Sequence, residues 1–217
     1  MNATSRPESN SALLLRDFVN TRDVECDADE LATPAKLGAW LAGRGLLAAG
    51  QPPGTAAAPD EGDLEMARDL REGLREAMHD HHAPTGEPLP PELDAVLARL
   101  PLRLSLAGER PVLVPLGAGA PAALARLAAA VLDAVADGSW PRLKVCLEGT
   151  CRWAFLDTSK NRSRNWCSMR VCGNRTKTRA YRARRRPAPG SGAPGVSGGE
   201  VPGGEASDAA TPPRERT

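Results

Sequence analysis

The stretch CLEGTCRWAFLDTSKNRSRNWCSMRVCGNRTKTRAYRARRR, Cys146 to Arg186, decides how the rest of this 217-residue chain is interpreted. It holds two cysteine pairs, Cys146 with Cys151 and Cys167 with Cys172, each with four residues between its members. Fifteen residues separate the two pairs. Two short cysteine pairs at this separation are typical of a tetrahedral metal site, and thiolate ligands favour zinc. We therefore predict one Zn²⁺ ion bound by all four cysteines.

Three other interpretations of the cysteines stay open. Two disulfides would need an oxidising compartment, and the polar residues 1–10 show no export signal. An iron–sulfur cluster uses the same ligands, and four unrelated buried thiols are the least specific interpretation. Cys26 lies in a distant acidic stretch and is expected to be a free thiol. Because no export signal is found, we expect a cytoplasmic protein, whose reducing surroundings keep thiolates available.

A small β-hairpin is predicted between the two cysteine pairs. Trp153 and Phe155 alternate with other side chains, which indicates a short strand. Turn-forming residues follow, and residues 164–167 are expected to return as the second strand, with Trp166 in a shared core. Gly173 suits a chain that needs a positive φ to fold around a metal. So small a unit cannot bury enough surface alone, so the metal should supply much of its folding free energy.

A basic segment follows the last cysteine and predicts a helix. Asn174 suits an N-cap, and no proline interrupts the chain before Pro187. Ala180 and Ala183 are small enough to dock this helix on the hairpin. The arginines that recur along one helical stripe are Arg175, Arg179, Arg182 and Arg186.

Charge is strongly segregated along the chain. Residues 142–186 carry 14 Lys or Arg and two acidic residues, whereas the remainder carries 14 basic and 25 acidic residues. The overall net charge of +1 hides this difference. A basic module of this kind is typical of proteins that bind polyanions. The residues expected to contact nucleic acid are Arg162, Arg164, Arg175, Lys177, Arg179, Arg182 and Arg184.

The segment FLDTSKNRSRNWCSMRVCGNRTKTRAYRARR resembles the CGNR zinc finger, which is named for the run Cys172 to Arg175. Family members often carry two arginines before the Trp-Cys pair, and Asn165 takes one of those places here. The resemblance implies a zinc-binding module that contacts DNA, with one basic contact fewer.

The N-terminal part resembles the ABATE domain, which precedes this finger in its family. The similar stretches are DFVNTRD, Asp17 to Asp23, and LATPAKLGAWLAGRGLL, Leu31 to Leu47. Together with the finger, the resemblance covers about residues 12–186. The family is described as candidate stress-induced transcription regulators, so the resemblance implies DNA binding without naming a target or a signal.

Periodicity in the first part of the chain predicts mainly helices. A helix capped by Thr33 with Pro34 at its first position should end before Gly45. Residues 11–20 form an apolar run that fits helix or strand. Further helices are expected over 63–81, 91–100 and 121–137, and a β-hairpin over 102–106 and 112–114. The last of these helices should turn inward the side chains of Leu124, Leu127, Val131, Leu132 and Val135.

The predicted fold class is therefore a mainly α N-terminal domain with a small β-hairpin (α+β) over residues 11–140. A four-cysteine zinc finger made of a β-hairpin and a basic helix follows over 141–186. The linker is short, so the finger should pack on the first domain. The Gly/Pro-rich residues 187–217 are expected to be disordered. No run reaches the roughly 18–20 apolar residues of a membrane span.

No sequence pattern for catalysis is found. Phosphate-binding loops, dinucleotide motifs and HExxH are absent from the sequence. A site closed by four thiolates also leaves no position for a catalytic water. His79 and His82 are spaced for a metal, although such residues more often interact with solvent or with a helix C-terminus. We therefore expect a protein that is not an enzyme.

The preferred function is a zinc-dependent regulator that binds duplex DNA. Its N-terminal domain would sense a small-molecule ligand or mediate assembly into an oligomer, with no membrane partner. Two alternatives stay open. One is an RNA-binding factor, although exposed aromatic residues for base stacking are few. The other is a finger whose basic face binds an acidic protein surface, including the acidic N-terminal domain of the same chain.

Overall fold

The computed structural model describes residues 10–47, 58–82, 91–108 and 111–185. The helices within these ranges are α1 (Asn10–Val19), α2 (Pro34–Gly43), α3 (Glu61–Asp80), α4 (Pro91–Leu97), α5 (Gly119–Ala136) and α6 (Asn174–Arg185). The strands are β1 (Arg22–Asp23), β2 (Ala28–Asp29), β3 (Leu102–Ser105), β4 (Val112–Pro115), β5 (Leu143–Val145) and β6 (Ala154–Leu156). The strands form three separate two-stranded antiparallel sheets, β1 with β2, β3 with β4 and β5 with β6. The predicted mainly α fold with small hairpins is confirmed.

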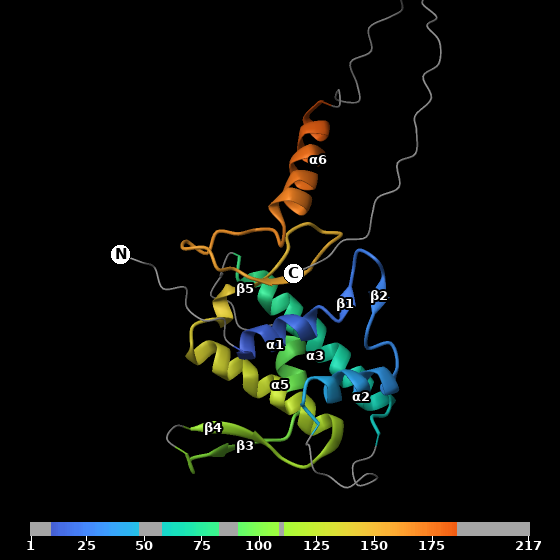
Figure 1. The fold of residues 1–217 in the computed structure, drawn as a ribbon, viewed down its shortest axis with the longest axis vertical. Helices are drawn as coiled ribbons and strands as arrows, with labels where there is room; N and C mark the ends of the chain where they lie inside the picture. Colours follow the sequence, from blue (N-terminus) through green and yellow to red (C-terminus); the bar gives the residue numbers. More distant parts are fainter. Residues whose placement is uncertain (1–9, 48–57, 83–90, 109–110, 186–217) are drawn as a thin grey trace, which may run out of the picture.

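The helices of the N-terminal part pack around α3. Its apolar side chains recur at helical spacing and are buried as predicted: Leu64, Ala67, Leu70, Leu74 and Met78. A capping box between Asp60 and Asp63 begins the helix. Gly73 lets α4 approach closely, because a Cβ there would lie 3.1 Å from the Cα of Leu93. In Figure 1 α6 projects from one end of this body and the β3–β4 hairpin lies at the other.

The start of α2 agrees with its sequence prediction, whereas the sequence had left α1 open between helix and strand. The apolar run that fitted helix or strand is helical, and α1 packs against α5. In α2, the Thr33 hydroxyl accepts a hydrogen bond from the Lys36 amide at 3.3 Å, and Pro34 occupies the first position. Gly45 lies past the end of the helix with a φ of +66°. The predicted cap and its proline are therefore confirmed.

Helix α5 differs from its prediction in the face that it buries. Leu124 and Leu127 are buried, but Leu132 and Val135 are 46% and 51% exposed. Alanines cover much of the buried face instead, because they allow the neighbouring helices to approach closely: Ala120, Ala123, Ala130 and Ala134. With a mean hydropathy of 1.4 over 18 residues, α5 is the one helix among the described residues that could cross a membrane by length and composition alone. Half of it is buried inside the protein, as in a core helix.

The hairpin of the finger also differs from its prediction. Strand β6 pairs with β5, in the register Leu143 to Leu156, whereas residues 164–167 form no strand. The partner strand therefore precedes the first cysteine. Strand β5 is fully buried and packs on α3, while β6 contacts α1. The expected packing of the finger on the first domain is thus confirmed. Arg186 and the predicted tail 187–217 lie outside the described residues.

Candidate metal centre and nucleic-acid interface

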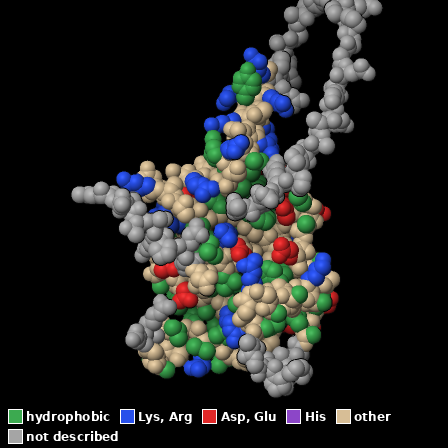
Figure 2. Space-filling model, in the orientation of Figure 1, with side chains coloured by type: hydrophobic (Ala, Val, Ile, Leu, Met, Phe, Trp, Pro, Cys, Tyr) green, Lys and Arg blue, Asp and Glu red, His purple; other side chains and the backbone are tan. Residues whose placement is uncertain are grey.

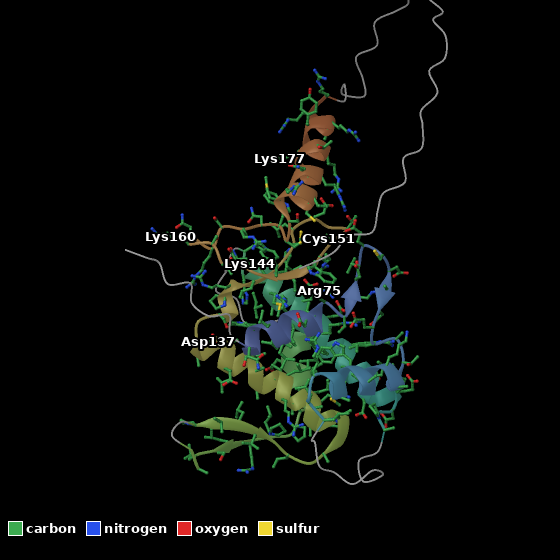
Figure 3. All side chains as sticks on the ribbon, viewed as in Figure 1. Arg75, Asp137, Lys144, Cys151, Lys160 and Lys177 are labelled. Carbon is green, nitrogen blue, oxygen red and sulfur yellow. The ribbon has the colours of Figure 1, made fainter. Side chains whose placement is uncertain are left out.

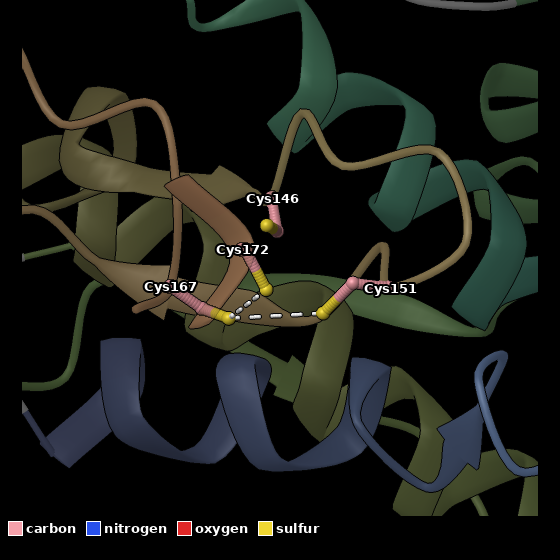
Figure 4. Close-up of side chains that lie close together, drawn as sticks. All are labelled: Cys146, Cys151, Cys167 and Cys172. Atoms are coloured by element: carbon pink, nitrogen blue, oxygen red, sulfur yellow. Dashed lines mark hydrogen bonds between the residues drawn. The ribbon is translucent and has the colours of Figure 1, made fainter. Parts of the chain in front are cut away.

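Four cysteine sulfurs converge beside α1 (Figure 4). All four Sγ atoms lie within 4.8 Å of one another, and Cys167 Sγ is 3.7 Å from both Cys151 Sγ and Cys172 Sγ. A tetrahedral ion with Zn–S bonds of about 2.3 Å places its sulfurs about 3.8 Å apart. The four side chains are therefore positioned to bind one metal ion. Among the described residues, no other cluster of three or more His, Cys, Asp or Glu side chains is placed to do so.

Two tight turns present the cysteines. Cys146 follows β5 directly, and the Cys151 amide donates to the Glu148 carbonyl at 2.8 Å, which turns the chain back within five residues. Arg152 then takes a φ of +48°, which is uncommon for a residue with a side chain. Cys172 lies in a π-helical turn, Met169–Gly173, whose first residue follows the capping Ser168. The backbone amides of Cys167 and Glu148 face the sulfur of Cys146, and that of Trp153 faces the sulfur of Cys151.

The four thiols influence one another's pKa values. Hydrogen bonds from the Cys146 and Cys167 thiols hold the pKa of Cys151 far below its usual range. Hydrogen bonds with Cys146 and Cys151 raise the pKa of Cys167, and burial, together with the charge of Cys151, raises the pKa of Cys172 to about 12. Four thiols this close together oppose one another's ionisation, because like charges repel. A divalent ion would allow all four sulfurs to ionise together.

A buried ion pair supports the loop between the cysteine pairs. Lys144 Nζ donates to Asp157 Oδ2 at 3.0 Å, and both side chains are almost completely buried. The Ser159 hydroxyl and the Arg164 amide also donate to Asp157, at 2.6 and 3.0 Å. Lys144 donates in addition to the Arg162 carbonyl. The loop is therefore held by a hydrogen-bonded pair of charges. The backbones of Arg162 and Arg164, the two residues of this loop predicted to contact DNA, are bonded directly to that pair.

Helix α3 fixes the finger to the body through arginine. Arg75 is 1% exposed and lies where α1, β1 and the finger meet (Figure 3). Its guanidinium donates to the Arg152 carbonyl at 2.7 Å and to the Val19 carbonyl at 2.6 Å. Arg152 pairs in turn with Glu76 of α3. The turn that carries Cys151 is thus tied directly to the central helix.

The end of α3 also contacts β5. His81 Nδ1 lies 2.7 Å from the Leu143 carbonyl, and His82 Nε2 lies 2.6 Å from the Val145 carbonyl. Burial lowers the pKa of both imidazoles. The possible metal pair of His79 and His82 is therefore not supported, since His82 contacts the backbone of the strand that leads into the cysteines.

The start of the basic helix differs from the sequence prediction. The helical turn begins at Ser168, so Asn174 is no N-cap, and its side chain donates to the Arg170 carbonyl at 3.0 Å. Gly173 does not need a positive φ; a Cβ there would lie 2.4 Å from Met169 Sδ and 3.4 Å from the Trp166 ring. A side chain at this position would therefore displace the half-exposed Met169 side chain. Helix α6 then leaves the body with every residue at least partly accessible, so the predicted docking of its alanines is wrong.

The first turns of α6 are anchored by two carboxylates. Arg175 Nη2 donates to Glu25 Oε1, beside β1, at 2.8 Å. Arg179 Nη2 donates at 2.8 Å to Glu148 Oε1, whose side chain is fully buried within the Cys146–Cys151 turn. Thr176 and Thr150 hydroxyls also donate to Glu148, at 2.9 and 3.2 Å. Burial alone would raise the pKa of Glu148, but these hydrogen bonds lower it overall.

The predicted nucleic-acid contacts therefore fall into different environments. Arg164 stacks 4.9 Å from the Phe155 ring centre and donates to the Cys167 carbonyl at 2.8 Å, so it supports the finger. Arg162 is exposed. Lys177, Arg182 and Arg184 are exposed and form no ion pair with any described residue. Figure 2 shows Lys and Arg side chains gathered on the projecting helix, with acidic side chains on the body beneath it.

Sequence reasoning missed Glu148 and Glu25 as partners of the basic helix. The available signal was that Glu148 is one of only two acidic residues within the basic stretch 142–186. A carboxylate kept among so many cations and beside a cysteine fits a structural ion pair better than a solvated side chain. Glu25 gave no comparable signal, because it lies 150 residues from Arg175 in a stretch with several other acids.

Comparison with protein-family models gives two matches that together span most of the chain. Residues 142–185 match the CGNR zinc finger. Residues 14–138 match the ABATE family, described as "Putative stress-induced transcription regulator". Both resemblances identified in the sequence are confirmed. A comparison with curated proteins finds no match.

Proposed function

The chain belongs to the ABATE family and carries a CGNR zinc finger, and from these facts we propose that it is a zinc-dependent DNA-binding protein that regulates transcription. The observation that carries the proposal is the thiol cluster of Cys146, Cys151, Cys167 and Cys172 at the base of the basic helix α6. Neither matched family is described as a family of enzymes. A cytoplasmic location would follow from this role.

Zinc is the metal best suited to the site. Soft thiolates select zinc or iron–sulfur chemistry, and sulfur atoms 3.7 Å apart fit one tetrahedral ion. An iron–sulfur cluster would need more space between the sulfurs, because its ligands bind different iron atoms. Bound zinc would close the turns that support α6. Much of the free energy that orders the finger would then come from the metal.

Duplex DNA is the polyanion that suits α6 best. The helix has 12 residues, which corresponds to about 18 Å, and its Lys and Arg side chains project from a slender rod. The major groove accepts one α-helix of this kind. Phosphate contacts would supply most of the affinity, and one or two arginines could recognise guanine. With about four to six phosphates contacted, log K should fall with log salt at a slope of about −4 to −5.

The N-terminal domain is the candidate sensing or assembly part. A cavity of about 510 Å³ lies where α1 meets the finger, and its lining includes Arg16, Arg44, Phe155 and Arg164. Ligand-binding sites often lie at the junction of two modules. A ligand there would touch both matched segments of the chain, including Cys167.

An RNA-binding role is the second candidate. The observation that favours it is Tyr181, which is 51% exposed on the basic helix and could stack on an unpaired base. Competition between duplex DNA and structured RNA for the same protein separates the two roles. Preferred binding of RNA at equal length and salt would support this second candidate over the first.

The test uses the full chain. Metal content of the purified protein should approach one zinc per chain, and filter binding to duplex DNA should show the steep salt dependence given above. Chelation, or Cys151→Ser, should abolish binding, and added Zn²⁺ should restore it only after chelation. Cys26→Ser is the matched control, because Cys26 is exposed and outside the cluster. Affinity that is independent of salt, or unchanged after metal removal, would refute the proposal.

A further inference from the structure

The two sides of α6 have different surroundings. One side, which we call the inner face, carries Arg175, Thr176 and Arg179, and these three residues contact Glu25 and Glu148. Because successive residues turn by about 100° in an α-helix, Lys177, Tyr181 and Arg184 lie about 135–165° away from the centre of that side. These three residues define the outer face. All three are exposed, and Lys177 is labelled on the projecting helix in Figure 3.

The outer face continues into the last turn of the helix. The guanidinium carbon of Arg185 lies 5.0 Å from the centre of the Tyr181 ring, so this arginine stacks on the tyrosine. The sequence has no acidic residue between Asp157 and Arg186. Cations on this side of the helix therefore have no carboxylate nearby in the chain that could neutralise them.

The inner face is poorly suited to phosphate. A phosphate that approached Arg179 would have to compete with the carboxylate of Glu148, whose side chain is fully buried. Separating that pair would leave a buried charge without its cation, which is costly. At Arg175 a phosphate would meet the negative charge of Glu25. Like charges at these positions would repel the nucleic-acid backbone.

We infer that the outer face of α6, formed by Lys177, Tyr181 and Arg184, is the surface that contacts the sugar–phosphate backbone of duplex DNA. This inference rests on the proposed DNA-binding function. It keeps Lys177 and Arg184 among the contacts predicted from sequence and removes Arg175 and Arg179 from them. Arg175 and Arg179 are positioning residues: they hold α6 on the cysteine turn and on the first domain, so that the opposite side meets the partner. Tyr181 gives the face one flat hydrogen-bonding side chain between two cations.

Two double variants that remove equal charge separate the faces. Lys177→Gln/Arg184→Gln removes two outer cations, and Arg175→Gln/Arg179→Gln removes two inner ones. The outer variant should weaken binding at low salt about tenfold or more and make the slope of log K against log salt less steep by about 2. The inner variant should also weaken binding, because α6 is then held less firmly, but it should keep the wild-type slope within about 0.5, because no phosphate contact is lost. An equal or larger loss of slope in the inner variant would overturn the inference.

A second measurement on the wild-type chain avoids any effect of substitution on folding. Lysine acylation followed by mass spectrometry reports which amines the DNA covers. DNA should protect Lys177 strongly and leave exposed Lys36 of α2 unprotected. Equal modification of Lys177 with and without bound DNA would contradict the assignment of the face. Absence of any salt-dependent binding by the wild type would instead refute the proposed function itself, so the two failures are distinguishable.

Discussion

The ion pair between Glu148 and Arg179 gives the sharpest test of how α6 is held. Its two members are not equivalent, because the Glu148 side chain is fully buried whereas the Arg179 side chain is 60% exposed. Removing the arginine leaves a carboxylate inside the protein with only two hydroxyl donors. Removing the charge of the glutamate leaves an arginine that water can solvate. We therefore expect Arg179→Ala to destabilise the zinc-loaded protein more than Glu148→Gln does.

The expected free energies follow from these surroundings. Breaking a buried pair costs about 3–5 kcal/mol, and we expect about 2–3 kcal/mol for Arg179→Ala because solvent screens the exposed guanidinium. Glu148→Gln keeps the shape and part of the hydrogen bonding, so its cost should be about 1–2 kcal/mol. In the double variant the neutral amide needs no cation. The double variant should therefore cost about 2 kcal/mol less than the sum of the two single changes.

Urea unfolding of the zinc-loaded chain, followed by far-ultraviolet circular dichroism, measures all three variants. Arg175→Ala is the matched control, because its partner Glu25 is 23% exposed and the pair should contribute less than about 1 kcal/mol. Additivity of Glu148→Gln and Arg179→Ala within about 0.5 kcal/mol would show that the carboxylate does not depend on this arginine. The role of Glu148 as the link between the cysteine turn and α6 would then be wrong.

Three further outcomes are expected from unfolding measurements. Asp157→Ala should lower the free energy of unfolding by about 3–5 kcal/mol, because it leaves the Lys144 ammonium buried without its carboxylate; a loss below about 1 kcal/mol would contradict this. Burial lowers the pKa of His81, so its contribution to stability is complete above the unfolded pKa near 6.5 and is lost as pH falls toward the folded pKa. His81→Asn should therefore reduce the difference in the free energy of unfolding between pH 7.5 and pH 5. An unchanged difference would count against this role of His81. Gly73→Ala should destabilise by about 1–3 kcal/mol despite the better helix propensity of alanine, because a Cβ meets the neighbouring helix backbone, whereas Gly43→Ala, with nothing within 4 Å, should be neutral or slightly stabilising.

The cluster of four cysteines was predictable from sequence because its chemistry is carried by a few residues at fixed spacing. Two cysteine pairs with equal gaps seldom occur in a reduced protein without a metal, and the structure brings all four sulfurs together. Helices α2 and α3 were predictable for a related reason. The cap of α2 and the apolar repeat of α3 are local signals that need no knowledge of the partner. Features that depend on a few neighbouring residues were therefore predicted correctly from the sequence.

Pairings between distant segments were not predictable in the same way. The three residues of β5 show no alternation, because the strand is buried on both sides, so residues 164–167 were the more obvious partner for β6. In α5, the small side chain of Ala134 packs inside while the larger Val135 is half exposed. Side-chain size alone would have ranked them in the opposite order. Which side of α5 is buried was decided by the close packing of the helices, and that packing depends on the tertiary structure.

The basic helix shows the same limit for function. Periodicity placed Arg175 and Arg179 on one stripe, and both were predicted, together with Lys177 and Arg184, to contact nucleic acid. The structure shows that these arginines already have carboxylate partners, and that Glu148 belongs to the turn between the first two cysteines. An ion that closes this turn would fix Glu148, and Glu148 would fix the first turns of α6. Metal binding would then control the direction in which Lys177 and Arg184 point. Loss of the metal should therefore change the orientation of α6 while the charge of its surface stays the same.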